Sequence, residues 1–349
     1  MAHNPMVSIC MPAYNHAPFL PAALDSILAQ TFRDFELVVV DDGSTDGSFE
    51  ILESSARKYP DVMRVLTHPG RQNLGISVTS NVVVKEARGV YFCPHASDDV
   101  SYPDRLERQV GFLESHPEID WVYGTADFID EQGARFEGQF GHDLSAFPDL
   151  AEELVLDNRI AGATVLIRTK CMLEVGQFEP ELMYGDWEFF IRLAARCPSA
   201  FLPGAVAGYR CHGYNSSLIF PFDASLERRL ENLRHSLEAI TALRRKADAA
   251  DVQLGRPRIK GLLDLRRAAF LILLHQRQSA SLAAAEVFRS DPSFRGDLKH
   301  LAHCLRHFGS LRLALMMIRE LGFPPSWLAD KDFVSALLRM GLQRVSSRG

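Results

Sequence analysis

The amino-terminal part of the chain alternates short apolar runs with amphipathic stretches. Apolar runs of strand length occupy residues 7–11, 35–40, 62–67 and 90–93. The stretches between them have the apolar spacing of helices, and we expect helices over residues 18–30, 46–56 and 77–87. The second run is apolar almost throughout, which is typical of a strand buried on both faces of a parallel sheet. This alternation predicts right-handed βαβ units, and therefore an α/β fold with a mostly parallel sheet flanked by helices.

The pattern becomes less regular in the middle of the chain. We predict strands over residues 121–127 and 163–167, a short amphipathic helix over 186–195, and a strand over 200–209. These segments would add strands to the same sheet, so the α/β part is expected to extend past residue 209.

Beyond residue 222 the chain is rich in Leu, Ala and Arg, and the strand signal disappears. Residues 225–250 and 262–276 have the periodicity of helices. The segment 332–344 is amphipathic as well; we favour a helix packed in a protein core, with a helix at a membrane surface as the alternative. We therefore predict two domains, an α/β domain over residues 1–220 and an α-helical domain over residues 221–349.

Charge divides along the same boundary. Residues 221–349 carry 22 Lys and Arg against 13 Asp and Glu, whereas residues 1–220 carry 16 against 31. A basic carboxy-terminal domain suits an anionic partner, such as a membrane surface or an acidic molecule. We do not expect nucleic acid as a partner, because no basic and aromatic interleaving or groove-binding motif accompanies the charge.

Composition indicates an ordinary globular protein, since 47% of the 349 residues are hydrophobic and 23% are charged. No apolar stretch approaches the ~20 residues needed to span a bilayer, and the amino terminus lacks a signal-peptide pattern. We expect a cytoplasmic protein, with peripheral contact to the cytoplasmic face of the membrane as an extension. The six cysteines form no C-x-x-C pair, so we expect reduced cysteines and neither a zinc site nor a disulfide framework.

Polar side chains follow three of the predicted strands directly. They are Tyr14 with Asn15, Asp41 with Asp42, and Asp98 with Asp99. Ligands bind outside the carboxyl ends of the strands in an open α/β sheet, so these clusters are expected to share one site. Adjacent carboxylates there suit Mg²⁺ or Mn²⁺ carrying a phosphate. The alternative is that Asp98 and Asp99 are a solvated pair opening the following helix, for which Pro103 is well placed.

The segment Asp41–Asp46 has the sequence DDGSTD. A carboxylate at this position can accept an N–H group from uracil or a similar base, and Gly43 permits a tight turn that lets the backbone approach a ligand. The alternative is an ordinary β-turn rich in Asp, Gly and Ser.

Taken together, these motifs resemble the family 2 inverting glycosyltransferases. The matching segments, which cover roughly residues 5–215, are VSICMPAYN (7–15), SILAQTF (26–32), FELVVVDDGSTD (35–46), NLG (73–75), Asn81, SDD (97–99), PDRL (103–106), GQFE (176–179) and GDWE (185–188). The resemblance implies a GT-A fold, a nucleotide-diphosphate sugar donor such as a UDP-sugar, Mn²⁺ or Mg²⁺ as cofactor, and transfer with inversion.

The resemblance also implies roles for individual residues. Asp186 would be the general base, and Asp99, with Asp98 and His212, would bind the metal. The residues implied in binding the nucleotide and its diphosphate are Pro12, Ala13, Tyr14, Asn15, Asp41, Asp42, Arg71, Asn81, Asp98 and Arg210. Three alternatives stay open: Asp186 as a helix cap, Arg210 and His212 in a polar interdomain loop, and Arg71 as a plain surface residue.

The chain departs from the family pattern at two positions. Ala96 stands where members often carry an acid, which puts the number of metal ligands in doubt, although Mg²⁺ commonly binds through one or two carboxylates. Ser80 stands where members often carry an Arg, and Arg71 or His95 could replace that contact.

We therefore predict a metal-dependent inverting glycosyltransferase of hexosyltransferase type. The acceptor would be a hydroxyl of a glycan, a lipid-linked molecule or another acceptor in cell-surface polysaccharide or glycoconjugate synthesis, and the helical domain would bind the acceptor, oligomerise or dock on a membrane. One alternative is a non-catalytic nucleotide-sugar-binding module descended from the family. Another is a sugar-phosphate nucleotidyltransferase, which the missing glycine-rich phosphate loop disfavours.

Overall fold

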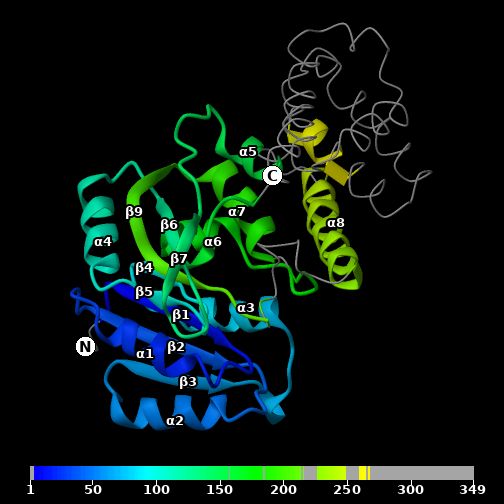
Figure 1. Ribbon diagram of the computed structural model, residues 1–349. Helices are drawn as coiled ribbons and strands as arrows, with labels where there is room; N and C mark the ends of the chain where they lie inside the picture. The colour runs from blue at the N-terminus through cyan, green and yellow to red at the C-terminus, as the bar shows by residue number, and fades with distance from the viewer. Residues whose placement is uncertain are drawn as a thin grey trace, which may run out of the picture. The chain divides into compact units, whose positions relative to one another are not determined.

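A computed structural model describes residues 4–156, 158–183, 185–213, 215, 226–248, 259–264 and 266–267. The chain divides into two compact units, one of residues 1–151 and 158–217 and one of residues 152–157 and 218–349 (Figure 1). Each unit is described by itself. The assignment of separate domains to residues 1–220 and 221–349 stays a prediction.

The first unit is organised around a nine-stranded sheet. The strand order is β3-β2-β1-β4-β8-β6-β9-β5, and β7 pairs with β6 outside this path. The strands are β1 (Val7–Ala13), β2 (Phe35–Asp41), β3 (Met63–Thr67), β4 (Tyr91–Pro94), β5 (Val100–Ser101), β6 (Trp121–Ile129), β7 (Arg135–Phe140), β8 (Leu166–Arg168) and β9 (Ser199–Arg210).

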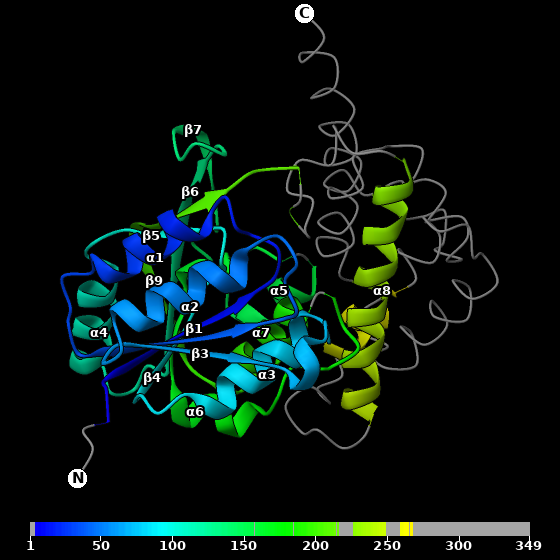
Figure 2. The same ribbon diagram turned by 90° about the horizontal axis from the view of Figure 1, so that it is seen from below.

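Helices cover both faces of the sheet, so the predicted α/β class is confirmed. They are α1 (Leu20–Leu28), α2 (Ser48–Lys58), α3 (Ile76–Glu86), α4 (Arg105–Ser115), α6 (Thr169–Val175) and α7 (Gly185–Arg196), with short 3₁₀ turns η1 (Pro69–Arg71) and η2 (Gly162–Thr164). Most residues of α5 (Leu150–Leu156) belong to the second unit. Helices α1 and α2 lie on one side of strands β1 to β3, and α3 lies on the other (Figure 2). This two-sided arrangement follows from right-handed crossovers that run in opposite directions along the sheet.

Strand β1 is the position where the strand order reverses. It pairs in parallel with β2 on one side, from Val7 opposite Phe35 to Ala13 opposite Asp41, and with β4 on the other side. The carboxyl ends of β1, β2 and β4 therefore emerge at the same edge of the sheet. In open α/β sheets a ligand crevice forms at such a reversal, so this topology sets the location of a site.

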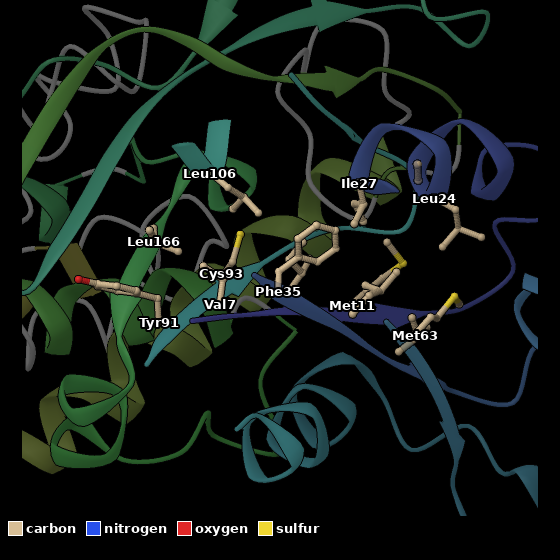
Figure 3. Close-up of a cluster of buried hydrophobic side chains, with 14 of the residues drawn as sticks. Val7, Met11, Leu24, Ile27, Phe35, Met63, Tyr91, Cys93, Leu106 and Leu166 are labelled. Carbon is tan, nitrogen blue, oxygen red and sulfur yellow. The ribbon is translucent and has the colours of Figure 1, made fainter. Parts of the chain in front are cut away.

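The core of this half is a cluster of aliphatic and aromatic side chains between the sheet and its helices (Figure 3). Helix α1 contributes Leu20, Ala23, Leu24 and Ile27, whose spacing places them on one helix face, and all four are buried. They join Val7, Met11 and Phe35 of the strands in the same cluster. Each fully buried large side chain of this kind stabilises the fold by about 1.5–3 kcal/mol, so the cluster gives the carboxyl ends of the strands a rigid support.

The second half of the sheet is mixed, where the sequence predicted mostly parallel pairing. Strand β8 runs antiparallel to both β4 and β6, β5 runs antiparallel to β9, and β6 and β9 are parallel. Strands β5 and β7 were not predicted. The first has only two residues, and the second is exposed over nearly its whole length, so neither carries the apolar signal on which the prediction depends.

Two cysteines are paired, which corrects the expectation of reduced cysteines. A disulfide joins Cys171 in α6 to Cys197, the residue after α7, with a Cα–Cα distance of 6.7 Å. No spacing motif indicates this pair, because the two residues are 26 positions apart and only the packing of α6 against α7 brings them together. Cys10, Cys93 and Cys211 are free, and Cys304 lies outside the described residues.

The second unit contains α8 (Leu226–Asp248) and a short helical segment over residues 259–264. Arg244 of α8 pairs with Asp264 through Nε and Oδ1 at 2.8 Å. The helix predicted over 225–250 is confirmed, while most of the segment 262–276 and all of 332–344 lie outside the described residues. Among the helices that the structure describes, none combines the length and hydrophobicity needed to cross a bilayer.

Candidate functional site

Three polar segments meet at the reversal point of the sheet. His16 follows β1, the loop 95–99 follows β4, and the end of β9 reaches them through the pairing of Val100 with Gly208. His95 N donates to Cys10 O at 2.9 Å, which continues the contact between β1 and β4 beyond the strand. Residues far apart in the sequence therefore converge where the topology places a ligand crevice.

Two histidines face the Asp98 carboxylate. His212 Nε2 lies 3.0 Å from Asp98 Oδ2, and His16 Nε2 lies 3.8 Å from the same oxygen. The ligand atoms of these three residues all lie within 4.8 Å of one another. We call this group the His–Asp–His cluster. It brings together two of the predicted residues, Asp98 and His212, with one residue that was not predicted.

The charges of this cluster are mutually dependent. Burial acts to raise the pKa of Asp98, but the hydrogen bond from His212 and the charges of the two histidines outweigh it and lower that pKa. Burial lowers the pKa of His16. Asp98 is therefore a carboxylate and His16 a neutral imidazole near pH 7, which are the protonation states that a metal ligand requires.

Asp99 and Arg210 position the His–Asp–His cluster through hydrogen bonds next to Asp98. Asp99 Oδ1 accepts a hydrogen bond from Arg210 N at 2.8 Å, and burial together with the charge of Asp98 raises the Asp99 pKa. The Arg210 guanidinium is buried and donates to the carbonyl groups of Asp98, Asp130 and Glu131 at 2.7–3.0 Å. This geometry suits positioning of the acid pair. The metal contact of Asp99 and the phosphate contact of Arg210 stay predictions.

The His–Asp–His cluster fits a divalent metal ion by its chemistry and spacing. Neutral imidazoles and a carboxylate are ligands for Mn²⁺ and related ions. Metal bonds of about 2.1 Å place neighbouring ligand atoms about 3.0–3.5 Å apart, close to the separations found around Asp98 Oδ2. Asp98 and His212 therefore remain the best-placed predicted ligands.

A second buried acid pair lies at the end of β2, and its two carboxylates have different partners. Asp42 accepts hydrogen bonds from Leu74 N and Gly75 N at 2.7 and 3.0 Å, so its carboxylate fixes the loop before α3. Asp41 accepts from Ser44 N through Oδ2 at 3.1 Å, whereas its buried Oδ1 has no hydrogen-bond partner among the described residues. A buried carboxylate oxygen without a donor is costly, and a base N–H group would satisfy it. Of the two acids, the geometry favours Asp41 as the contact to a base.

The residues after β1 lie beside this acid pair. Ala13 is buried and accepts the Asp42 amide at 2.8 Å, while Pro12 is half-buried and Tyr14 is 44% exposed. Asn15 has a positive φ of 51°, and its Oδ1 accepts Thr45 N at 2.8 Å. The β1 and β2 loops are thus connected, with the Tyr14 side chain open to solvent beside them.

Arg71 and Asn81 differ in their suitability for nucleotide binding. The Arg71 guanidinium lies 4.0 Å from the centre of the Phe49 ring and 4.0 Å from Asp41 Oδ2, so it is near the acid pair. Asn81 instead bonds Phe178 twice, through Phe178 N and Phe178 O, both at 2.8 Å. Its amide fixes the segment before α7, and a nucleotide contact by Asn81 stays a prediction without geometric support.

Gly43 allows the chain to turn between the acid pair and α2. Its φ is +75°, and a Cβ there would lie 2.6 Å from Arg71 O and 2.8 Å from Asn73 N, both backbone atoms. We expect Gly43→Ala to lower the free energy of unfolding by about 1–3 kcal/mol, because strain and a backbone clash combine. Urea denaturation measures this loss.

The matched control is Gly111→Ala in α4, where φ is not positive and no atom lies within 4 Å of the added Cβ. Alanine favours helix, so this variant should be as stable as the parent or slightly more so. Equal losses in the two variants would show that the Gly43 backbone has room for a side chain.

Asp186 begins the first turn of α7. The residue is exposed, yet desolvation of its carboxyl group raises its pKa, against hydrogen bonds from Trp187 N at 2.7 Å and from Asn158. A carboxylate that solvent can reach and whose basicity is raised is suited to accept a proton. The alternative role of helix cap has less support, because Asp186 is the second residue of α7 and its Oδ1 accepts the amide of the next residue. A cap precedes the helix and accepts an amide two or three residues further on.

Contacts with α3 connect the start of α7 to the strand ends. Ser77 Oγ donates to Leu182 O at 2.6 Å, and a Cβ on Gly185 would lie 2.5 Å from the same hydroxyl oxygen. Ser77 is in the first turn of α3, two residues beyond Gly75, whose amide Asp42 binds. The start of α7, which carries the predicted base, is therefore connected through the start of α3 to the acid pair of β2.

A buried ion pair fixes α7 itself. Arg192 binds Glu188 through Nε and Oε1 at 2.7 Å and through a second hydrogen bond at 2.8 Å. It also donates to Val175 O and Gln177 O at 2.6 and 2.8 Å. Both side chains are almost fully buried, so the segment that precedes Asp186 is held against its helix.

Sequence reasoning missed three contributors to the site. They are His16, Ser97, whose Oγ lies 2.8 Å from His16 Nδ1, and Phe19, whose ring stacks on that of His212 at 4.5 Å. The position of His16 directly after Tyr14 and Asn15 was an available signal, because it follows β1 at the reversal point.

His95 is buried, and burial with the nearby Arg105 charge lowers its pKa to about 3.

Known proteins resemble this chain in both sequence and fold. Residues 8–170 match the family described as Glycosyl transferase family 2. An uncharacterized glycosyltransferase of Rickettsia felis is 31% identical over 217 residues, which are 61% of this chain and 35% of that protein. The matches cover 35–61% of the length of the first three curated relatives.

Two solved structures share the fold at low sequence identity. Residues 1–349 of Staphylococcus aureus TarS in complex with UDP align over 98% of this chain and 91% of that one, with 19% identity and a TM-score of 0.53. The Pyrobaculum calidifontis mannosyltransferase PcManGT, in complex with GDP-Man and Mn²⁺, aligns over 99% and 89%, with 16% identity and a TM-score of 0.53. In its matched region this chain is similar to glycosyl transferase family 2, and its α/β fold is of the GT-A type.

Proposed function

We propose that the protein is a metal-dependent inverting glycosyltransferase that moves a hexosyl group from a nucleotide-diphosphate sugar, such as a UDP-sugar, to an acceptor hydroxyl. The observation that carries this proposal is the convergence at the strand ends. A metal-compatible His–Asp–His cluster follows β1, β4 and β9, and a buried carboxylate oxygen of Asp41 faces no donor among the described residues. The ligands bound in the two structural relatives, UDP in one and GDP-Man with Mn²⁺ in the other, belong to the same chemical class.

In this proposal the β1 and β2 loops bind the nucleoside. Asp41 Oδ1 accepts the N–H group of the base, while Pro12, Ala13 and Tyr14 line its pocket beside Asn15 and Arg71. Asp42 acts indirectly, since its carboxylate already fixes the loop before α3. Asn81 and Arg210 act in the same indirect way, through their backbone contacts.

Asp98 and His212 hold the cation, and Asp99 is the alternative carboxylate. When bound, Mn²⁺ or Mg²⁺ neutralises the negative charge that develops on the departing nucleoside diphosphate. Arg210 and Asp99 fix Asp98 from its backbone side, and Phe19 stacks on the His212 ring. These contacts orient the ligands before substrate arrives.

Asp186 accepts the proton of the acceptor hydroxyl. The acceptor oxygen forms a bond to the anomeric carbon as the bond from that carbon to the diphosphate oxygen breaks, and the electron pair leaves with the diphosphate. A single displacement of this kind inverts the anomeric configuration. The raised pKa of Asp186 strengthens the carboxylate as a base, and its exposure gives an acceptor access.

The acceptor class is a glycan, a lipid-linked molecule or another hydroxyl compound of cell-surface polysaccharide or glycoconjugate synthesis. The basic carboxy-terminal part supports an acidic acceptor or peripheral contact with the cytoplasmic face of a membrane. The non-catalytic alternative is disfavoured by the exposed Asp186 carboxylate on a fixed helix start.

A panel of nucleotide sugars tests the proposal with the whole chain. We expect one UDP- or GDP-linked sugar, together with Mn²⁺, to raise the melting temperature, because a ligand at 100 times its Kd stabilises the folded state by about 2.7 kcal/mol. The same donor should be hydrolysed or transferred slowly, releasing the nucleoside diphosphate. Binding without any turnover would support the non-catalytic module, and pyrophosphate release from a nucleoside triphosphate would support the nucleotidyltransferase.

A further inference from the structure

We propose that His16 is a third protein ligand of the cation, beside Asp98 and His212. The site would then present two imidazoles and one carboxylate, and it would favour Mn²⁺, Fe²⁺, Co²⁺ or Zn²⁺ over Mg²⁺. The inference rests on the proposed metal dependence of the enzyme, and it adds a ligand and a metal preference that the motifs do not contain.

Geometry is the first support. His16 Nε2 and His212 Nε2 approach the same oxygen, Asp98 Oδ2, at 3.8 and 3.0 Å. Ligand atoms around one ion with bonds of about 2.1 Å lie about 3.0–3.5 Å apart in neighbouring positions. A shift of the His16 ring by a few tenths of an ångström brings its Nε2 into that range of Asp98 Oδ2, and all three ligand atoms already lie within 4.8 Å of one another.

Ser97 is the second support, because it contacts the other ring nitrogen of His16. The Ser97 hydroxyl lies 2.8 Å from His16 Nδ1. A hydroxyl oxygen can accept the Nδ1–H group, and this fixes the tautomer in which Nε2 carries a lone pair. Histidines that bind metals characteristically donate their second ring N–H group to such a partner.

The His16 backbone is fixed on both sides, which directs its ring toward Asp98. His16 N donates to Ser48 Oγ at 2.9 Å, and His16 O accepts the amides of Phe19 and Leu20 at 2.9 and 3.0 Å. The ring meets that of His212 edge to face, with centroids 5.7 Å apart. His16 is thus positioned by the start of α1 and by the first residue of α2 before any ion binds.

The ligand set determines the metal preference. Mg²⁺ favours oxygen ligands in a near-ideal octahedron and retains several waters, whereas imidazole suits later first-row metals. Two imidazoles beside a single carboxylate therefore disfavour Mg²⁺. A site built only from Asp98, Asp99 and waters would have the opposite preference.

Calorimetric titration of the full chain with MnCl₂, CoCl₂ and MgCl₂ tests the proposal. We expect Kd values for Mn²⁺ and Co²⁺ that are at least about tenfold lower than for Mg²⁺. His16→Ala should raise the Mn²⁺ and Co²⁺ Kd by about 10–100-fold and change the Mg²⁺ Kd much less. The matched control is His142→Ala, an exposed histidine outside the cluster, which should leave all three values unchanged.

A second measurement keeps the test decisive if His16→Ala is unstable. In spectra of the parent protein with ¹⁵N-labelled histidines, the diamagnetic ion Zn²⁺ should shift the Nε2 signals of His16 and His212 together, because a ring nitrogen that binds a metal no longer has a free lone pair. A shift of the His212 signal alone, or an unchanged Mn²⁺ Kd in a folded His16→Ala variant, would overturn the role of His16 and leave the proposed function intact. If the parent binds none of these ions, even with the nucleotide present, the proposed metal dependence fails and His16 with it.

Discussion

Replacing Asp186 with Asn is expected to lower the turnover number by about 10²–10⁴-fold, the usual contribution of a positioned general base. An amide has nearly the shape of the carboxylate and can still accept the hydrogen bond from Trp187 N, so the start of α7 should persist. It cannot accept the proton of the acceptor hydroxyl. Affinity for the nucleotide should therefore stay within about twofold, because no binding contact is lost.

The measurement is a transfer assay with the donor found by the panel, paired with calorimetric binding of the nucleoside diphosphate. Glu181→Gln is the matched control, since it removes an exposed carboxylate in the segment before α7 and should leave turnover unchanged. Full turnover by Asp186→Asn would remove Asp186 from the mechanism.

The pH profile gives this prediction a second readout. The pKa of Asp186 is raised above the usual value of an aspartate, so the base loses activity at a higher pH than an ordinary carboxylate would. Turnover should rise with pH through that raised pKa and then level off, because the deprotonated form is active. The residual activity of Asp186→Asn should lack this limb.

Asp98→Asn is expected to weaken Mn²⁺ binding by more than about tenfold and to reduce transfer by at least about 100-fold. The carboxylate at the centre of the His–Asp–His cluster is its only charged oxygen ligand, and loss even of an outer partner in metal sites costs about 10–100-fold in affinity. The effect on turnover adds to this, because the departing diphosphate would lose its neutralising charge. Metal titration and the transfer assay measure the two losses separately.

Asp99→Asn is the matched comparison, because it changes the adjacent carboxylate in the same way. Its Oδ1 accepts Arg210 N, a role that an amide oxygen can fill, and its raised pKa means that burial already disfavours the charge. We expect the smaller effect from this variant. A larger loss of metal binding from Asp99→Asn than from Asp98→Asn would support the motif-based assignment and contradict the structural one.

The first half of the fold could be predicted from sequence because its signals are local. Strands β1 to β4 and helices α1 to α3 end within a few residues of their predicted bounds, since each strand is an apolar run and each helix has an apolar stripe. Local signals fail for β5, with two residues, and for the exposed β7, whose pairing depends on the partner strand. The antiparallel position of β8 between β4 and β6 depends on long-range strand pairing, which the hydrophobic periodicity of a single strand does not predict.

The site residues also divide into those that sequence motifs identify and those that only the three-dimensional structure reveals. Motifs identified Asp98 and His212, and the structure brings them within 3.0 Å of each other. They did not identify His16, because its position after β1 indicates a nearby site but no ligand role until β9 places His212 against it. Motifs also cannot distinguish a residue that contacts a ligand from one that only positions other residues. Asn81 uses its amide on Phe178, and Arg210 donates to backbone carbonyls, and only three-dimensional packing reveals this.

The buried Arg210 side chain connects the Asp98–Asp99 pair to a turn at the surface. One guanidinium joins Asp98 O to Asp130 O and Glu131 O, which lie in the turn between β6 and β7. The same guanidinium group therefore holds both the exposed hairpin and the backbone of the acid pair. We therefore expect insertions or exchanges in the hairpin to change the geometry of the acid pair, without any change in the side chains that the proposed function assigns to the substrate.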